Sequence, residues 1–413
     1  MAGRVIPIQR AEDALRRNAA VADRHLRPGA IRLPALPPLS LYVHFPWCVR
    51  KCPYCDFNSH EAPAGGLPED LYLQALRRDL ETSLPLVWGR RVESVFIGGG
   101  TPSLLSAAGL DRLLSDLRAL LPLAADAEIT MEANPGTFEA EKFRAFRASG
   151  VNRLSIGVQS FADAQLQALG RIHTGADAMR AIEAAAREFD NFNLDLMYAL
   201  PQQSVADLEA DLTRALGFAP THLSIYQLAI EANTVFAKYP PALPDEDTVD
   251  AMLDLIEART VAAGFDRYEV SAYARGGARS RHNLNYWTFG DYLGIGPGAH
   301  GKISFAERIV RQARVRGPDS YLREVFDGSA VAEEREVGVD ELGFEFMLNA
   351  LRLRAGVPAA LFEERTGCAL ATIAAPLEQA RARGLLEPEP TELRTTALGW
   401  RFLNEVQAMF LAA

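Results

Sequence analysis

The stretch Tyr42–His60, YVHFPWCVRKCPYCDFNSH, holds three of the four cysteines of this 413-residue chain. Cys48, Cys52 and Cys55 are spaced as C-x₃-C-x₂-C and follow a short apolar run that is typical of a strand. Thiolate ligands select zinc, copper(I) or iron–sulfur clusters. A four-iron cluster takes four ligands, so three cysteines would leave one iron open to a small molecule. The spacing therefore predicts a metal centre with an open position.

A zinc site is the alternative, because structural zinc takes four protein ligands. His44 and His60 flank the cysteines and are candidates for the fourth ligand. The remaining cysteine, Cys368, lies in ERTGCALATI and is expected to be a small, buried apolar residue. Clustered cysteines without a disulfide framework indicate a reducing compartment, so we expect a cytoplasmic protein.

From residue 40 onward, β-rich runs alternate with helical patterns. Several of the runs are almost continuously apolar, which is typical of strands buried on both faces of a parallel sheet. Six βα units in succession predict an α/β fold with right-handed crossovers, but periodicity does not decide whether the sheet closes. The expected strands are residues 41–45, 94–97, 128–132, 153–158, 192–197 and 223–228.

The segment after the second strand predicts a helix in detail. Thr101 is a candidate N-cap, and Pro102 suits the first helical position. Leucines then recur at three- and four-residue spacing, which lays one apolar stripe against the sheet. These leucines are Leu110, Leu113, Leu114, Leu117 and Leu121.

The regular alternation fades past residue 232. A helix is expected over residues 245–263, and the chain becomes mainly helical from about residue 318. The late stretch ARGLLEPEPTELRTTALGW indicates a helix end, a short hairpin and a final helix, which together are compatible with a winged-helix-like unit. We therefore predict an Arg-rich extension over residues 1–39, an α/β domain over 40–310 and a helical domain over 311–413.

Composition excludes several classes of function. The net charge of −10 argues against a general nucleic-acid binder. No run of eighteen or more apolar residues occurs, so no integral membrane segment is expected. The first 38 residues contain seven arginines and no lysine. The acidic residues Glu12, Asp13 and Asp23 favour a surface arm or short helix over a targeting segment.

The cysteine loop resembles the signature of the radical S-adenosylmethionine superfamily. Gly98–Pro102 (GGGTP) follows the second strand, Glu132–Pro135 (EANP) the third, and Gly157–Ser160 (GVQS) the fourth. Glycines permit close approach of a ligand, and free NH groups at a helix start favour a carboxylate. A carboxylate at a strand end can hold ribose hydroxyls. The resemblance implies a partial (β/α)₆ barrel that carries a [4Fe-4S] cluster and S-adenosylmethionine.

Within the superfamily, the motifs SIGVQSF, LGRIHT and NLDLMYALPQQ resemble the oxygen-independent coproporphyrinogen III oxidase group, and most of all its haem chaperones. The resemblance implies that Cys48, Cys52 and Cys55 hold the cluster. Arg171 suits the methionyl carboxylate, and Asp195 an adenosine hydroxyl. The implied S-adenosylmethionine pocket comprises Tyr42, Tyr54, Gly99, Gly100, Thr101, Glu132, Gln159, Arg171 and Asp195.

One departure bears on the activity. The pattern of the oxidases is C-x₃-C-x₂-C-x-C, with a further cysteine two residues after the third. In this chain Phe57 occupies that position. A phenyl ring has no thiol chemistry, so radical decarboxylation of porphyrinogen propionates becomes the alternative, and whether the protein is an enzyme stays open.

A second motif, HNLNYW at His282–Trp287, resembles the H-N-x-x-Y-W sequence linked to haem binding in the chaperones. The neutral imidazole of His282 can ligate haem iron, and aromatic rings offer flat apolar surface. Arg279 and Arg281 are candidates for the propionates, His300 is the competing ligand, and His44 and His173 are expected near the cluster. The implied haem-binding residues are His282, Asn283, Tyr286 and Trp287.

The sequence thus predicts a haem-binding chaperone on a radical S-adenosylmethionine scaffold that delivers haem to haem proteins. The resemblance is compatible with an electron donor and with a homodimer. A zinc-stabilised interaction protein is the remaining alternative.

Overall fold

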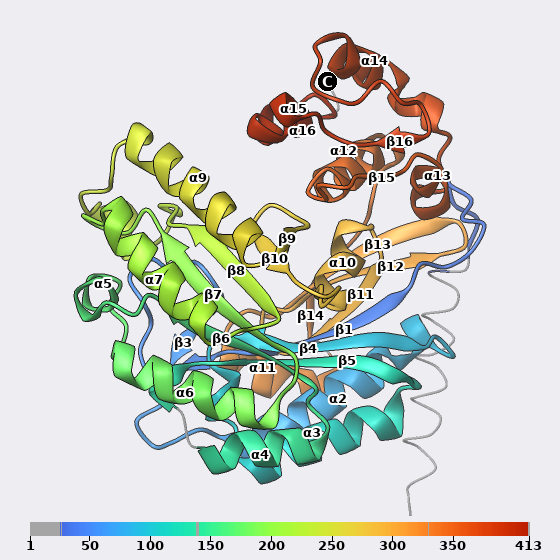
Figure 1. The fold of residues 1–413 in the computed structure, drawn as a ribbon. Coiled ribbons are helices and arrows are strands. Elements are labelled where there is room, and N and C mark those ends of the chain that lie inside the picture. The colour runs from blue at the N-terminus through green and yellow to red at the C-terminus, as the bar shows by residue number, and fades with distance from the viewer. Residues whose placement is uncertain (1–24, 26, 138–139, 329, 412–413) are drawn as a thin grey trace, which may run out of the picture.

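The computed structural model describes residues 25, 27–137, 140–328 and 330–411 (Figure 1). Of the expected Arg-rich extension over residues 1–39, residues 25 and 27–39 are described, and the rest lies outside the described residues. Its described end does not form a detached arm, because Ile31 and Leu33 are buried in a core shared with the C-terminal part of the chain. The backbone NH of Leu33 donates to the carbonyl of Ala306, which fixes this segment along a hairpin.

A twelve-stranded sheet forms the centre of the molecule, with the order β14-β13-β12-β11-β1-β4-β5-β6-β7-β8-β10-β9. All six strands predicted from the sequence are present, lie side by side in chain order and pair in parallel. They are β1 (Leu39–Phe45), β4 (Val92–Gly99), β5 (Leu123–Ala133), β6 (Arg153–Gln159), β7 (Phe192–Tyr198) and β8 (His222–Gln227).

Helices cover the outer face of the curved sheet (Figure 1). They are α2 (Glu69–Val87), α3 (Ala107–Leu120), α4 (Ala140–Ser149), α6 (Gly175–Glu188), α7 (Val205–Gly217) and α9 (Glu246–Ala262). The short helices α5 (Asp163–Ala168) and α8 (Val235–Lys238) belong to the connections after β6 and β8. The α9 bounds confirm the predicted helix, whose N-cap is Asp245.

The helix after β4 begins later than the sequence suggested. Thr101 and Pro102 lead into a single 3₁₀ turn, Pro102–Leu104, without a side-chain cap. Ser106 is the N-cap of α3, because its hydroxyl accepts from the NH of Gly109. The predicted leucine stripe is buried against the sheet, as expected.

The edges of the sheet were not predicted. β11 (Asp291–Ile295) pairs in parallel with β1, and three antiparallel strands follow: β12 (His300–Phe305), β13 (Arg308–Arg314) and β14 (Val331–Glu336). At the other edge, β10 (Ala272–Ala274) and β9 (Asp266–Arg267) extend β8. The pairing order does not close on itself, so the six βα units form a partial barrel, as the resemblance implied.

The boundary expected at residue 310 falls inside β13, and β14 still belongs to the large sheet. The short helix α11 (Pro318–Glu324) and the 3₁₀ turn Val325–Asp327 lie between these two strands. We propose that the two domains divide near Val337, between β14 and α12.

The C-terminal domain packs around its own apolar core. Its helices are α12 (Val339–Ala350), α13 (Ala360–Thr366), α14 (Ala374–Ala382), α15 (Ala397–Arg401) and α16 (Leu403–Ala408), and its two-stranded sheet joins β15 (Val357–Pro358) to β16 (Glu392–Leu393). The antiparallel bridge between Leu386 and Thr395 forms the short hairpin expected before the final helices, in agreement with a winged-helix-like order. None of the described helices combines the length and apolarity needed to cross a membrane.

Candidate functional site

A cavity of about 300 Å³ opens at the C-terminal ends of the parallel strands. We call it the inner cavity. In parallel α/β folds the loops at this edge bind ligands, because helix N-termini and strand ends meet there. The structure brings eleven of the twelve residues expected for the cluster and S-adenosylmethionine to its wall. They are Cys48, Cys52, Tyr54, Cys55, Gly99, Gly100, Thr101, Glu132, Gln159, Arg171 and Asp195.

The twelfth, Tyr42, lies outside this wall. Its side chain lines a neighbouring cavity, and its hydroxyl lies 3.0 Å from Nδ1 of His44. The expected contact of Tyr42 with S-adenosylmethionine therefore stays a prediction.

The cysteine loop is held by backbone and lysine contacts. A short parallel pair joins β2 (Trp47–Cys48) to β3 (His60–Glu61), and the Lys51 ammonium donates to the carbonyls of Phe57 and Ser59. All three thiols are free and partly exposed. Burial raises the pKa of the Cys48 and Cys55 thiols, so without a metal they are protonated near neutral pH.

Within the described part of the chain, no fourth protein ligand joins these thiols, as the zinc alternative would need. Nε2 of His44 donates to the carbonyl of Asn58, and its Nδ1 accepts from the hydroxyl of Tyr42. Cys368 is buried in the C-terminal core, as predicted. Among the described residues, no three His, Cys, Asp or Glu side chains converge as for a single metal ion. Three thiols along one cavity fit a cluster with three protein ligands better than a zinc ion with four.

The glycine motif after β4 has a different physical cause from the one expected. The NH of Gly100 donates to the carbonyl of Phe45, and the NH of Thr101 donates to that of Trp47, so neither is free for a carboxylate. A Cβ on Gly100 would lie 2.5 Å from the Trp47 carbonyl oxygen. Gly99 has a φ of 114°, which also favours glycine. These glycines let the end of β4 contact the cysteine loop directly.

Two carboxylates face the inner cavity from β5 and β7, the two strands that flank β6. Burial, together with the charge of Asp195, raises the pKa of Glu132 to about 8. Oε2 of Glu132 accepts from the NH of Gly99 at 3.0 Å. Burial also raises the pKa of Asp195, whose oxygens accept from Asn193 and Ser155. Acceptors of this kind suit the hydroxyls of a ribose.

We expect the affinity for S-adenosylmethionine to rise about tenfold between about pH 7 and about pH 9, because the carboxylate form of Glu132 is the better acceptor and attracts the sulfonium. Equilibrium binding to the cluster-loaded protein at each pH tests this expectation. Glu132→Gln should bind more weakly and with a flat profile. A wild-type profile without a step would contradict the role of Glu132.

Arg171 connects the cysteine loop to the strand ends. Its Nη1 lies 3.9 Å from the Cys52 sulfur, and its Nη2 donates to Asn134 and to the carbonyl of Gly157. Nε of Arg171 is buried without a hydrogen-bond partner in the described structure. This guanidinium therefore has donor capacity left for a carboxylate beside the cluster.

Sequence reasoning missed the deep end of the inner cavity. Arg153, Ser155, Asn193, Ser224 and Tyr226 line it. A signal was present in the sequence: Arg153, Ser155, Gly157 and Gln159 alternate along one strand and so share one face.

The HNLNYW motif forms helix α10 (Arg281–Trp287), which does not present its residues on one common surface. His282 is only 2% exposed, its Nδ1 lies 3.0 Å from the Ser94 hydroxyl, and its Nε2 has no described partner. Burial lowers the pKa of His282 to about 3. Asn283 lines the inner cavity, Tyr286 the neighbouring one, and the Trp287 ring lies 4.2 Å from the Arg352 guanidinium.

The two arginines expected to bind the haem propionates already form ion pairs with aspartates of this chain. Arg279 forms an ion pair with Asp266 at 2.7 Å, and Arg281 with Asp126 at 3.3 Å. His173 lies in the segment that carries Arg171, and its Nε2 donates to the carbonyl of Val158.

The partial barrel, the three-cysteine loop and the cavity at the strand ends together define a radical S-adenosylmethionine protein. Comparison with known families agrees: the "Radical SAM superfamily" matches residues 42–215, and the "HemN C-terminal domain" matches residues 339–402.

Among curated proteins, the chain is 48% identical over 379 residues to "Heme chaperone HemW" of Escherichia coli (strain K12), with 91% of this chain and 99% of that protein covered. It is 41% identical over 357 residues to "Radical S-adenosyl methionine domain-containing protein 1, mitochondrial" of Mus musculus, with 82% and 80% covered. The solved structure of coproporphyrinogen III oxidase (HemN) from Escherichia coli is similar at a TM-score of 0.78 and 25% identity, with 91% and 90% covered. The chain belongs to the HemW family.

Proposed function

We propose that this protein binds haem and acts as a haem chaperone on a radical S-adenosylmethionine scaffold. The observation that carries the proposal is at the cysteine loop. Three free thiols line one cavity, while the side chain of Phe57, where the oxidases have a further cysteine, is 61% exposed at its mouth. The likeness to proteins named Heme chaperone HemW supports the same conclusion.

Each group of residues has a defined part in this proposal. Cys48, Cys52 and Cys55 would hold the [4Fe-4S] cluster, and Arg171 would receive the carboxylate of S-adenosylmethionine. Glu132 and Asp195 would accept from its ribose. When bound, the cluster and S-adenosylmethionine supply one-electron chemistry. The protein's own residues bind and orient them inside a cavity to which α10 contributes Asn283.

The second candidate is a coproporphyrinogen oxidase. It is favoured by the similarity to the solved HemN structure over nine-tenths of both chains. The exposed Phe57 argues against it, because a phenyl ring offers neither an acidic nor a redox-active group at that position.

A single preparation tests both candidates. We expect the protein with its cluster reconstituted under anoxia to bind about one haem per chain, read from the Soret band. We expect no decarboxylated product from coproporphyrinogen III with S-adenosylmethionine and a reductant. Turnover of the porphyrinogen without haem binding would reverse the assignment, and iron-free protein rich in zinc would restore the zinc alternative.

The expected location in the cytoplasm is part of this proposal and is supported by the cysteine cluster, which forms no disulfide, as is usual in a reducing compartment. Delivery of haem to an acceptor protein, an interaction with an electron donor and the formation of a homodimer stay predictions.

A further inference from the structure

The seven histidines of the chain differ sharply in exposure, and the structure describes all of them. Five have a relative exposure of 5% or less. These buried residues are His25, His44, His173, His222 and His282. A haem iron can be ligated without unfolding only by an imidazole that a haem can reach. That condition leaves His60 and His300.

Of these two, only His300 lies in a cavity with aromatic walls. The second cavity, which we call the outer chamber, has a volume of about 460 Å³. It lies beside the inner cavity, and Phe57, Gly99 and Glu132 line both. The residues that matter for its chemistry are Tyr42, Phe57, Tyr286, Tyr292, His300 and Arg316.

The walls of the outer chamber suit a flat apolar ligand. The rings of Tyr286 and Tyr292 lie 4.4 Å apart between centroids, and Phe57 contributes an exposed ring from the cysteine loop. Aromatic side chains gain energy against a planar conjugated ligand through stacked and edge contacts. Tyr286 belongs to the HNLNYW motif, so the motif reaches this chamber through its tyrosine.

His300 and Arg316 provide the polar contacts that a metalloporphyrin needs. Within the described part of the chain, no hydrogen bond engages the ring nitrogens of His300, in contrast to His44. Burial, helped by Arg311 and Arg316, lowers the pKa of His300 and so favours the neutral imidazole, which is the form that binds iron. Arg316 is exposed, lines the outer chamber and has no ion-pair partner among the described residues, so its guanidinium is available to a carboxylate.

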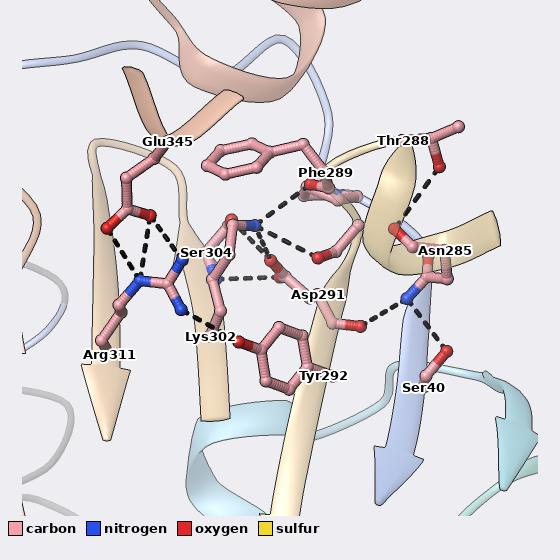
Figure 2. Close-up of polar contacts among 12 residues, drawn as sticks. Ser40, Asn285, Thr288, Phe289, Asp291, Tyr292, Lys302, Ser304, Arg311 and Glu345 are labelled. Carbon is pink, nitrogen blue, oxygen red and sulfur yellow. Dashed lines mark hydrogen bonds and ion pairs between the residues drawn. The ribbon is translucent and has the colours of Figure 1, made fainter. Parts of the chain in front are cut away.

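The position of this wall is set by the C-terminal domain. The hydroxyl of Tyr292 accepts from Nη1 of Arg311 at 2.9 Å, and Nε of Arg311 lies 2.9 Å from both oxygens of Glu345 on α12 (Figure 2). Glu345 thereby links the second domain to the aromatic wall. A chamber held from both domains is preorganised for its ligand.

We propose that haem binds in the outer chamber, with His300 as an iron ligand, Phe57 and Tyr286 against the porphyrin faces, and Arg316 paired with a propionate. This inference rests on the proposed function. It assigns the iron ligand to the strand β12 and not to His282, whose ring lies in the core behind Ser94 and Phe96.

The test compares iron-containing and metal-free ligands on the full chain with its cluster. Haem binding is read from the Soret band, and binding of metal-free protoporphyrin IX from fluorescence. We expect His300→Ala to weaken haem binding at least about tenfold. Its affinity for protoporphyrin IX should stay within about threefold of the wild-type value. Phe57→Ala should weaken both ligands, and Arg316→Ala should weaken both by about threefold. His60→Ala, a change at another exposed histidine, is the matched control and should bind both as wild type does.

The outcomes separate this inference from the proposed function. If the wild type binds haem and His300→Ala binds it equally well, the inference is wrong and the proposed function stands. If His282→Ala or His60→Ala loses haem while His300→Ala retains it, the ligand is reassigned to that residue. If His300→Ala loses both ligands equally, His300 shapes the chamber without binding iron, and the inference fails. If the wild type binds no haem, the proposed function itself fails.

Discussion

Cys52→Ala is expected to abolish cluster assembly. Wild-type protein reconstituted under anoxia should hold about four irons per chain, whereas the variant should hold less than about a tenth of that amount. The physical reason is that the cluster has only the three thiolates of this loop, and no other cysteine lies near the inner cavity to replace one. Iron and sulfide analysis, with the visible absorbance of the cluster, measures the loss.

Cys368→Ala is the matched control for this experiment. Its thiol is buried among apolar side chains of the C-terminal domain, so its removal should leave the iron content unchanged. Cys52→Ala should also lose S-adenosylmethionine binding, because Arg171 beside Cys52 would then face no cluster. Full iron content in Cys52→Ala, or iron loss in Cys368→Ala, would show that the ligands are assigned incorrectly.

The largest expected effect on stability lies in a buried ion pair at the start of β11, next in sequence to Tyr292 of the outer chamber. Nζ of Lys302 and Oδ1 of Asp291 lie 2.9 Å apart, and both side chains are almost fully buried (Figure 2). Asp291 also accepts from Ser304 and pairs with Arg90 at 2.8 Å. We expect Asp291→Ala to lower the free energy of unfolding by about 3–5 kcal/mol, because it leaves buried cations without a counter-charge. Urea denaturation of both proteins measures the difference.

Two variants make this prediction specific. Asp250→Ala removes one side of an exposed pair with Arg401 and should cost about 0–1 kcal/mol. Adding Lys302→Met to Asp291→Ala should recover part of the loss, because it removes a buried unpaired charge. Equal costs for the buried and the exposed changes would contradict the argument.

The same pair has a defined pH dependence. Burial by itself would raise the pKa of Asp291, but Lys302 and Arg90 outweigh it and hold the pKa below its ordinary value. A depressed carboxyl pKa stabilises the fold above the unfolded pKa, and this contribution is lost as the pH falls through the folded pKa. The difference in the free energy of unfolding between wild type and Asp291→Ala should therefore shrink only under acid conditions.

Much of the barrel could be predicted from the sequence because its signals are local. Each parallel strand is a short apolar run, and each following helix shows its own leucine or alanine stripe, as in α3 and α6. The cysteine spacing within one loop likewise predicts that three thiols face one site. The antiparallel edge strands were missed because β12 and β13 carry Lys302, Arg311 and Arg314 on faces that a sequence pattern assigns to solvent.

What the sequence by itself determined is the scaffold and the part of the inner cavity near the cysteine loop, since both depend on residues near each strand end. What only the tertiary structure decided is the place of α10. The NH of His282 donates to Glu128, a residue 154 positions earlier, and this contact turns the imidazole into the core while Tyr286 faces the outer chamber. Partners so distant in the chain leave no local pattern, because a side chain's burial depends on which strands surround it.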